Sequence, residues 1–575
     1  MKDITYIVPK NNKEVFVDPA IHRIPEMILA NKHTINRYTV EINGVPLPVL
    51  REKTRKELLR MAVRYTDGIQ SLIQKDRPGS CRYMRNSNQE DVSRHRVPET
   101  LSMKGLPLDS EAIRNIPIIQ TGHEPVFYYP GVWIKNHLAH YLATKMGGIG
   151  VNMIVDNDAC KMGFMHMPVL SEIPANIRKV ALVEGLDNVA YEDVAFDHVE
   201  TILRFREEII TLFKKNVSDE TIKTTMELMQ STFENFMNCV AGCYQMGCTD
   251  MVGLLSTARR SLETSFCLDN LEIPVSWMCD TDGFCQFLLH LFYNAERFAH
   301  IYNEKLAEYR AIHKIRSKAN PLPELKTEGN AVELPFWVWK AGEQRKRCYL
   351  RKEGESLGIT DGAEVFLTLK KGDGFPVQGA KLRELRHARV KLRPRAITAT
   401  MFSRLFFSDL FIHGIGGAKY DTITDEIIRE FFGIDPPSFA TISTTLFLPL
   451  ETFDVNTGTL HALHYELKDM NYNPERYASE ELLRDEGFIG RMKEKQRLLE
   501  MMAVCNGEEK SRYFHRIGEL NKLNLLRLEV EMEKKKKEIE EANNKLAYNE
   551  VVQFREYAVA IYPMKVLEEY FLRVF

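Results

Sequence analysis

A strand, a turn, a helix and a second strand follow one another between residues 116 and 158, and this unit constrains the fold most. "IPIIQTG" (116–122) is a short apolar run that ends in glycine, and "GVWIKNHLAHYLATKMG" (131–147) has helical spacing and a glycine stop. "GVNMIVDND" (150–158) is a second apolar run. This order is typical of the βαβ unit of a parallel sheet, so the sequence predicts an α/β protein.

The same alternation recurs further along the chain. "IPVSWMCDTDG" (273–283) leads into a long amphipathic helix over 284–310, and "DLFIHGIGG" (409–417) precedes "TDEIIREFFG" (424–433). Polar residues stand at the carboxyl ends of these expected strands, which is the edge where open α/β sheets bind their ligands. We therefore expect the functional site at that edge.

Changes of composition along the chain divide it into seven expected parts. The first contains a helix over 51–74 and a polar loop over 76–99 that we expect to be mobile. The parts are an N-terminal mixed segment (1–110), the first half of the core (111–194), a helical insertion (195–267), a core continuation with the long helix (268–330), a small β subdomain (331–380), the second half of the core with a glycine-rich loop (381–476), and a helical arm with a tail (477–575).

The expected arm carries a partial coiled-coil pattern. Its Glu-, Lys- and Leu-rich sequence repeats an apolar residue every seven positions, which is typical of one seam of a coiled coil. The intervening positions are only half apolar, so an antiparallel hairpin and a parallel homodimer both remain open. The seam consists of Leu525, Met532, Ile539 and Leu546, and the intervening positions are Leu528, Lys535, Ala542 and Asn549.

Charge and apolar runs exclude several classes of protein. The net charge is only -2, and the basic stretch 381–395 has no interleaved aromatic residues, so we expect no nucleic-acid partner. No apolar run reaches about 18 residues and the first residues lack a signal core, so we expect a cytoplasmic protein with no membrane partner. The Cys239, Cys243 and Cys248 spacing favours buried helix cysteines over a zinc site, and we predict no metal site.

The first candidate site follows the strand at 116–122. His123 and Glu124 lie in the loop after Gly122, and Pro130 opens a helix whose free N–H groups favour an anion. Lys135 lies in the first turn, where a cation opposes the helix dipole. The alternative is that the aromatic residues of this segment only pack and that His123 is a satisfied turn histidine.

The second candidate is the acidic end of the next strand. Asp156 and Asp158 flank Asn157, and strand alternation would place both carboxylates on one side, where they orient an amine or hydroxyl or bind a divalent ion. Helix capping and turn formation are the alternative roles.

The third candidate is the glycine-rich loop at 413–417. Its glycines would let backbone amides approach a phosphate closely, although the spacing matches neither the dinucleotide nor the P-loop motif. Upstream arginines, which suit bidentate binding of carboxylate or phosphate, favour an anion site over a flexible corner. The residues of this candidate are His413, Gly414, Gly416, Gly417, Lys419 and Asp421 with Arg393, Arg395 and Arg404.

The segment "TGHEPVFYYPGVWIKNHLA", followed by a strand ending in "DND", resembles the cysteine-adding enzymes of bacillithiol synthesis. That family has a T-G-Q-Q segment, a Gly-Pro pair, a T-I-Y-K helix start and a strand that ends in D-H-D. Here Thr121, Gly122, Lys135, Asp156 and Asp158 match, Pro130 and Gly131 stand near the Gly-Pro pair, and His123 and Glu124 replace the two glutamines.

The resemblance implies a Rossmann-like core akin to class I nucleotidyltransferases, connector insertions and a C-terminal coiled coil that dimerises the protein. The family's assigned reaction joins cysteine to a glucosaminyl-malate. Because His123 replaces an amide with a titratable base, the chain looks like a divergent bacterial branch, and the fold carries over better than the substrate.

We therefore expect a cytoplasmic enzyme that binds an anionic small molecule and performs ligation or group transfer. A nucleotide such as ATP or ADP is the candidate cofactor. His123 would be the general base or a phosphate contact, and Asp156 and Asp158 would orient the nucleophile or a metal. Lys419 and Arg404 would neutralise negative charge, with Thr121, Gly122 and Lys135 completing the anion site. The alternative is a non-catalytic scaffold whose helical arm recruits a partner.

Overall fold

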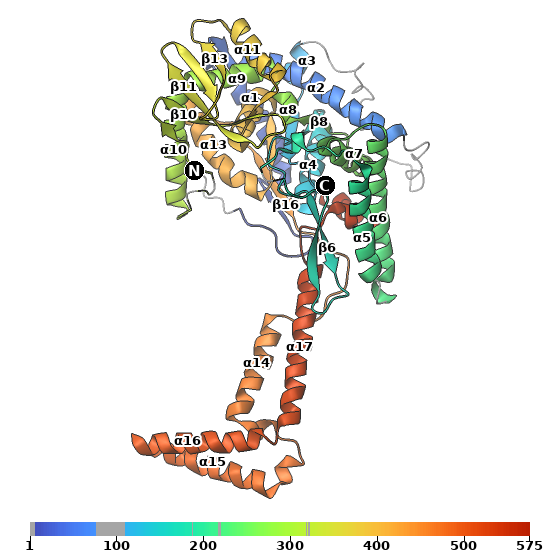
Figure 1. The fold of residues 1–575 in the computed structure, drawn as a ribbon, viewed down its shortest axis with the longest axis vertical. Helices are drawn as coiled ribbons and strands as arrows, with labels where there is room; N and C mark the ends of the chain where they lie inside the picture. The colour runs from blue at the N-terminus through green and yellow to red at the C-terminus, as the bar shows by residue number, and fades with distance from the viewer. Residues whose placement is uncertain (1–5, 76–109, 187, 217–219, 318, 320–321) are drawn as a thin grey trace.

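The structure, a computed structural model, describes residues 6–75, 110–186, 188–216, 220–317, 319 and 322–575. The polar loop expected at 76–99 lies outside these residues. The body of the molecule is a mixed α/β unit, from which a helical arm projects (Figure 1).

A six-stranded sheet forms the centre of the described body, in the order β1-β16-β15-β4-β5-β8. Neighbouring strands run parallel from β16 to β8, and the edge strand β1 runs antiparallel to β16. The α/β class and the parallel sheet predicted from the sequence are confirmed. The strands are β1 (Val15–Asp18), β4 (Ile118–His123), β5 (Ile149–Ile154), β8 (Leu271–Pro274), β15 (Leu410–His413) and β16 (Ala440–Thr444).

The strand order reverses direction once. From β4 the chain moves outward through β5 to β8, and it then returns to add β15 and β16 on the other side of β4. The connections that leave β4 and β15 therefore diverge, and a crevice opens between them at the carboxyl edge of the sheet. This point of reversal is where the geometry of the fold predicts a ligand.

Helices cover both faces of the sheet because successive strand side chains alternate between two hydrophobic cores. Ile118 and Phe411 pack into one core, whereas Ile119 and Ile412 pack into the other. The second core also receives α4 (Pro130–Met146) and the C-terminal α18 (Met564–Val574). The first core is covered by α2 (Leu47–Lys75), α9 (Asp282–Tyr293), α10 (Ala295–Ile312), α12 (Ala396–Phe402) and α13 (Ile415–Phe432).

Smaller elements complete the N-terminal part and the core. The helix expected over 51–74 is α2. The others are α1 (Ile24–Ile35), β2 (Glu41–Ile42), β3 (Val45–Pro46), α3 (Ser110–Asn115) and α8 (Val275–Met278).

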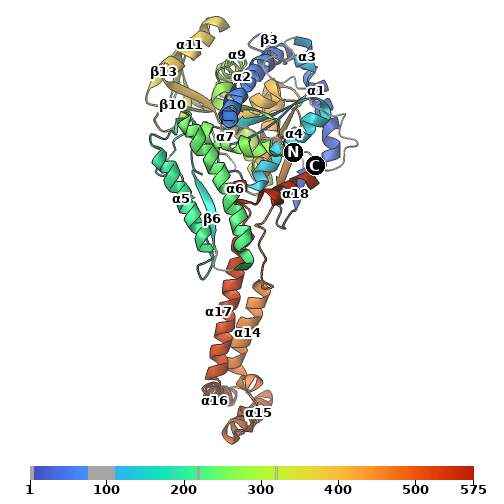
Figure 2. The ribbon, with the colours of Figure 1, turned by 90° about the vertical axis from the view of Figure 1, so that its right-hand side faces the viewer.

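The helical insertion lies between β5 and β8 and stands beside the body (Figure 2). Its first two helices pack against one another, and a β-hairpin precedes them and contacts the arm. The elements are β6 (Phe164–Val169), β7 (Asn176–Ala181), α5 (Val199–Asn216), α6 (Glu220–Gln245) and α7 (Met251–Thr264).

The small β subdomain is an antiparallel sheet in the order β13-β12-β11-β10-β14, with β9 paired to β10. It extends beyond the expected end at 380, because β14 pairs with β10 along its whole length. Arg393 therefore belongs to this sheet and not to the edge of the central sheet. The elements are β9 (Thr327–Glu328), β10 (Ala331–Lys340), β11 (Lys346–Glu353), β12 (Ser356–Thr360), β13 (Val365–Lys370), α11 (Phe375–His387) and β14 (Val390–Pro394).

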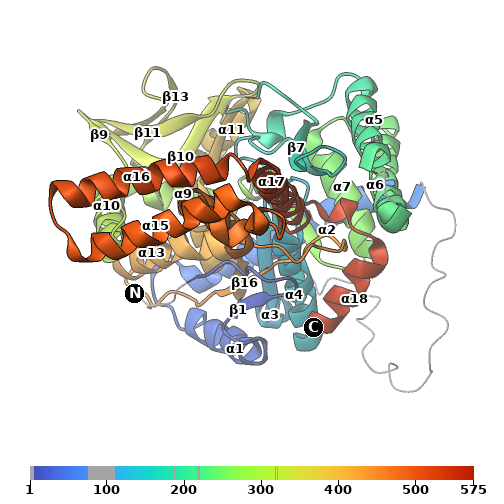
Figure 3. The same ribbon diagram turned by 90° about the horizontal axis from the view of Figure 1, so that it is seen from below.

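The arm begins earlier than 477, since α14 leaves the body and α17 returns to it (Figure 1). At the far end α15 and α16 pack side by side (Figure 3). The seven-residue seam is not one continuous helix, because α16 ends at Leu525 and Met532 lies on α17. The helices are α14 (Thr457–Tyr472), α15 (Glu486–Val504), α16 (Glu508–Leu525) and α17 (Glu529–Val552).

Across the described ranges, no helix combines the length and the apolar character needed to cross a membrane.

Candidate functional site

One cavity of about 460 Å³ lies at the point where the strand order reverses. His123, the last residue of β4, and Glu124, which follows it, line this cavity, and His413 and Gly414 line it from the end of β15. Two segments far apart in the sequence therefore meet in one cavity at the edge where the sequence predicts a functional site. They meet because parallel strands bring their carboxyl ends to the same edge.

The glycine-rich loop forms the N-terminus of α13. The first helical hydrogen bond is donated by the Ala418 N–H to the Gly414 carbonyl at 3.0 Å. The N–H groups of Ile415, Gly416 and Gly417 precede that bond, and all three residues line the cavity. The start of α13 thus presents backbone donors and the positive end of its dipole to an anion.

The space around Gly414, Gly416 and Gly417, and not their backbone conformation, explains why they are glycines, because none of them has a positive φ. A Cβ atom at Gly417 would lie 2.8 Å from His413 Nδ1, so only glycine lets the ring pack over the first turn. A Cβ at Gly416 would meet no atom within 4 Å among the described residues, so this glycine leaves the cavity open.

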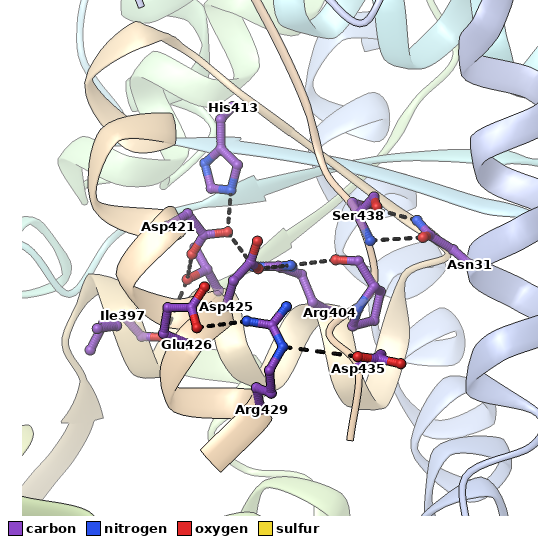
Figure 4. A network of polar contacts seen from close by, with 12 residues as sticks. Asn31, Ile397, Arg404, His413, Asp421, Asp425, Glu426, Arg429, Asp435 and Ser438 are labelled. Carbon is purple, nitrogen blue, oxygen red and sulfur yellow. Dashed lines mark hydrogen bonds and ion pairs between the residues drawn. The ribbon is translucent and has the colours of Figure 1, made fainter. Parts of the chain in front are cut away.

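His413 belongs to a buried network on α13 (Figure 4). Its Nε2 lies 2.9 Å from Asp421 Oδ2, and the same carboxylate accepts a 2.6 Å hydrogen bond from Arg404 Nη1. Arg404 also pairs with Asp425 and donates to the Pro437 carbonyl. Although burial opposes it, Arg404 and then His413 hold the pKa of Asp421 well below its usual range.

The role predicted for Arg404 is therefore wrong. Its guanidinium is 1% exposed and its charge is already neutralised by Asp421 and Asp425, so it orients the network and does not meet a ligand. Asp421 is likewise buried and reaches the cavity through His413 and Thr400, which both line it.

Arg393 and Arg395 are also occupied elsewhere. Arg393 makes a bidentate ion pair with Glu192 at 2.9 and 3.0 Å. Arg395 donates to Glu333 at 2.8 Å and lies over the Trp337 ring. Neither lines the cavity described above, so the prediction that these arginines bind an anion beside the glycine loop is not supported.

Lys135 lies in the wall of the cavity, but in the second turn of α4 and not in the first as predicted, because the helix begins at Pro130. Its Nζ donates a 2.6 Å hydrogen bond to the Gly122 carbonyl at the end of β4. Burial lowers the pKa of Lys135 to about 7, against the opposing effect of the Glu124 charge. Burial thus favours the neutral amine over the ammonium.

Glu124, and not His123, has the properties of an acid–base group. Burial and then the charge of Lys135 lower the pKa of His123 to about 3, so this imidazole is neutral and a weak base. Burial and then the charge of Asp158 raise the pKa of Glu124 to about 8, so its carboxyl holds a proton at neutral pH. The general-base role predicted for His123 is therefore corrected to that of a neutral hydrogen-bonding group.

Asp158 lines the cavity and remains ionised beside Glu124. Its Oδ1 accepts hydrogen bonds from Arg345 Nη1 at 2.9 Å and from the Ala159 N–H at 2.7 Å. Despite its burial, these contacts and a hydrogen bond with Glu124 lower the pKa of Asp158. A neutral carboxyl beside a fixed carboxylate is the arrangement expected of a proton donor.

Asp156 points away from this pair. Its Oδ1 accepts the Ser276 N–H at 2.9 Å, and burial and the charge of Glu192 raise the pKa of Asp156 to about 7. The expectation that Asp156 and Asp158 lie on one side is wrong, because β5 ends at Ile154 and the aspartates occupy a turn.

Thr121 is a structural residue. It is fully buried, and its hydroxyl donates to the Ile412 carbonyl at 3.0 Å, which ties β4 to β15. Gly122 lines the cavity and supplies the carbonyl that holds Lys135.

Two cations complete the cavity wall. Lys419 is exposed at its edge, and Arg555 enters it from the segment after α17. The Arg555 guanidinium lies so close to the first turn of α4 that a Cβ at Gly131 would be 2.7 Å from Nη2. Its Nε is buried, and within the described residues this atom has no hydrogen-bond partner.

Sequence reasoning placed Glu124 in the first candidate site without a chemical role, and it did not assign Arg345 or Arg555 to any site. Glu124 had a local signal, since it stands next to His123 between a strand end and a helix start. Arg345 and Arg555 had none, because each reaches the site through tertiary packing of a separate part of the chain.

The described residues contain no group of three or more His, Cys, Asp or Glu placed to hold a metal ion. Neither the models of known protein families nor the curated proteins give a match to this chain. The function of the chain is therefore inferred from the chemistry of the cavity.

Proposed function

We propose that this chain is a cytoplasmic enzyme that binds a phosphate-bearing small molecule in the cavity between β4 and β15 and performs ligation or group transfer. One observation carries the proposal: the N-termini of α4 and α13 and the cations Lys135, Lys419 and Arg555 all meet at this cavity. A cation against a helix N-terminus is unfavourable by itself. A bound anion between Arg555 and α4 would remove that repulsion.

The topology supports a Rossmann-like core. Numbered in chain order, the parallel strands β4, β5, β8, β15 and β16 stand in the order 3-2-1-4-5, and the cavity lies at the reversal between the first and the fourth. Dinucleotide-binding folds place the phosphates of their ligand at this point. A nucleotide is therefore one candidate ligand.

The acid–base chemistry would come from Glu124. Its neutral carboxyl donates a proton to a leaving oxygen, and Asp158, held by Arg345, keeps that carboxyl protonated between turnovers. The acceptor in the proposed transfer is an amine or a thiol. Addition of an amino acid to an amino-sugar conjugate, as in bacillithiol-type synthesis, is the substrate pair that the sequence resemblance suggests.

Filling the space at Gly416 should abolish phosphate binding. In Gly416→Leu the new side chain would occupy the cavity beside the free N–H groups, so we expect at least about a tenfold loss of affinity, the effect of about 1.4 kcal/mol. Thermal shift with inorganic phosphate, sugar phosphates and nucleotides measures it, because a ligand of the native state raises the melting temperature.

The matched control is Gly518→Leu, which changes another helical glycine with open space around it, on α16 of the arm. It should keep the response of the unsubstituted chain. An unchanged response in Gly416→Leu would place the anion elsewhere, and no response of the unsubstituted chain to any phosphate compound would contradict the proposed function.

A second candidate function is a scaffold that recruits a partner, including a second copy of the chain, through the arm. The specific observation is a set of exposed apolar side chains at its far end, where Val504, Leu526 and Val530 are 84%, 73% and 78% exposed. A partner that binds residues 477–550 alone, with no phosphate response from the body, would favour this function.

A further inference from the structure

The Lys135 amine is buried but faces the cavity. The whole residue is 4% exposed, its aliphatic chain passes beneath Gly414, and Nζ is held at 2.6 Å by the Gly122 carbonyl. A hydrogen bond to a single carbonyl fixes the direction of the amine without neutralising its charge. Lys135 therefore has a defined position in the cavity wall.

The surroundings of Lys135 differ from those of an ordinary lysine. Among the described residues no carboxylate forms an ion pair with Lys135, whereas buried charges are normally paired. Glu124, the acid whose charge would raise the pKa of Lys135, carries a proton at neutral pH because burial and Asp158 raise its own pKa. The amine therefore loses its proton readily, which is the condition under which a lysine becomes a nucleophile.

The groups that an amine–carbonyl reaction needs are present together. Lys135 supplies the nucleophile, Glu124 supplies a proton donor in the same cavity, and the start of α13 supplies a cradle for a phosphate. Lys419 lines the same cavity but is exposed, so it suits charge neutralisation and not nucleophilic attack.

We propose that Lys135 forms an imine with the carbonyl group of a phosphate-bearing aldehyde or ketone held in this cavity. The Nζ lone pair attacks the carbonyl carbon and gives a carbinolamine. The carbinolamine hydroxyl leaves as water with the proton that Glu124 donates, the C=N bond forms, and Glu124 recovers a proton from the nitrogen. One carbonyl compound and one amine thus give one imine and one water.

This inference rests on the proposed anion site. It restricts the substrates of the proposed group-transfer reaction to compounds with a carbonyl group. Ligation of an amino acid would need no deprotonated lysine. The Gly122 carbonyl alone does not explain Lys135 either, because any uncharged donor would satisfy it without a buried charge.

Trapping with pyridoxal 5′-phosphate, an aldehyde that carries a phosphate, tests the proposal on the full chain. The protein is mixed with less than one equivalent of the probe near neutral pH, reduced with borohydride and digested, and each lysine peptide is quantified by mass. We expect the phosphopyridoxyl group on Lys135 at a level at least about tenfold above that on Lys565, an exposed lysine of α18 with 85% side-chain exposure. This expectation follows because a pKa that is lower by one unit gives an about tenfold larger fraction of neutral amine.

Two variants and one competition experiment make the outcome decisive. Lys135→Arg should lose the specific label, whereas Lys565→Arg, on α18 and outside the cavity, should keep the label on Lys135. Labelling spread over exposed lysines with Lys135 unmodified would overturn the imine. The competition uses the unsubstituted chain and so does not depend on how Lys135→Arg folds.

The competition also separates this inference from the proposed function. Inorganic phosphate should reduce the labelling of Lys135 and raise the melting temperature of the chain. A melting temperature that rises without any labelling of Lys135 would support the anion site and overturn the imine. Labelling of Lys135 that phosphate leaves unchanged, without a thermal shift, would contradict the anion site and support a reactive lysine.

Discussion

Lys135→Met is expected to stabilise the chain relative to the native sequence near neutral pH, and the gain should shrink as the pH rises. Burial lowers the pKa of Lys135 to about 7 in the folded protein. An unfolded chain would titrate this amine at its ordinary pKa of about 10.4. Between these two values the unfolded state binds the extra proton, so native stability rises with pH by about 1.4 kcal/mol per unit.

Methionine keeps most of the volume of lysine and does not titrate. Below about pH 7 the native chain carries the full penalty of a buried ammonium, and the variant carries none. The difference in unfolding free energy between variant and native chain should therefore fall by about 3 kcal/mol between about pH 7 and about pH 9.5. Loss of the hydrogen bond to Gly122 adds a constant destabilisation of about 1 kcal/mol that does not change this slope.

Denaturant unfolding of both proteins at several pH values measures the difference. His123 and Glu124 titrate in the same cavity, and because the charge of Lys135 lowers the pKa of both, their contribution differs between the two proteins and adds to the measured difference. Lys419→Met, at the exposed edge of the cavity, is the control and should show no comparable slope. A pH-independent difference for Lys135→Met would mean that burial does not lower the pKa of this amine, and the proposed chemistry depends on that lowered pKa.

A substitution that stabilises a protein while removing a reactive group is the pattern expected where stability has been given up for function. The buried Lys135 would then be retained for its chemistry and not for its packing.

The parts of the site that follow from strand topology could be predicted from the sequence. Short apolar runs that end in polar residues identify the ends of parallel strands, and those ends meet at one edge whatever the length of chain between them. That argument predicts a functional site at this edge, where His123 and His413 both line the cavity. Lys135 followed from the helix start that β4 leads into.

The pairing of charges could not be predicted in the same way. Arg393, Arg395 and Arg404 lie close together in the sequence and their charges suit an anion, yet each meets a carboxylate from a different element. Sequence shows how many charges a segment carries but not whether the fold has already neutralised them. Arg555 hydrogen-bonds the neutral Ser443 and Thr444, and no carboxylate among the described residues forms an ion pair with it. A cation of this kind at a cavity is visible only in three dimensions.

The aspartates show a second limit, which is the position of element ends. The inference that Asp156 and Asp158 share one face required β5 to continue to residue 158, but the strand ends at Ile154. An error of a few residues in a strand end changes which side chains face a site. The predicted end of the small β subdomain at 380 was also misplaced. Its last strand, β14, belongs to that sheet through pairing with β10, which is distant in the sequence.

Arg404→Met is expected to destabilise the protein strongly, by about 3 to 5 kcal/mol, because it would leave the buried Asp421 without its main counter-charge. His413 and Thr400 would still hydrogen-bond that carboxylate, at 2.9 and 2.8 Å, but would not replace the guanidinium. The pKa of Asp421, now held low by Arg404 and His413, should rise in the variant. Protonation in mild acid would then relieve part of the penalty, so the loss should be smaller near pH 4.5 than near pH 7.

The control for Arg404→Met lies on the same network. Arg429 pairs with Glu426 on the surface of α13, with 48% of its side chain exposed, so Arg429→Met should cost less than about 1 kcal/mol (Figure 4). Chemical denaturation of both variants at the two pH values distinguishes the roles. If Arg404→Met unfolded as easily as Arg429→Met and lost only its phosphate response, Arg404 would be a ligand-binding residue after all. The expected result instead makes it the support that holds His413, through Asp421, at the cavity where the two helix N-termini meet.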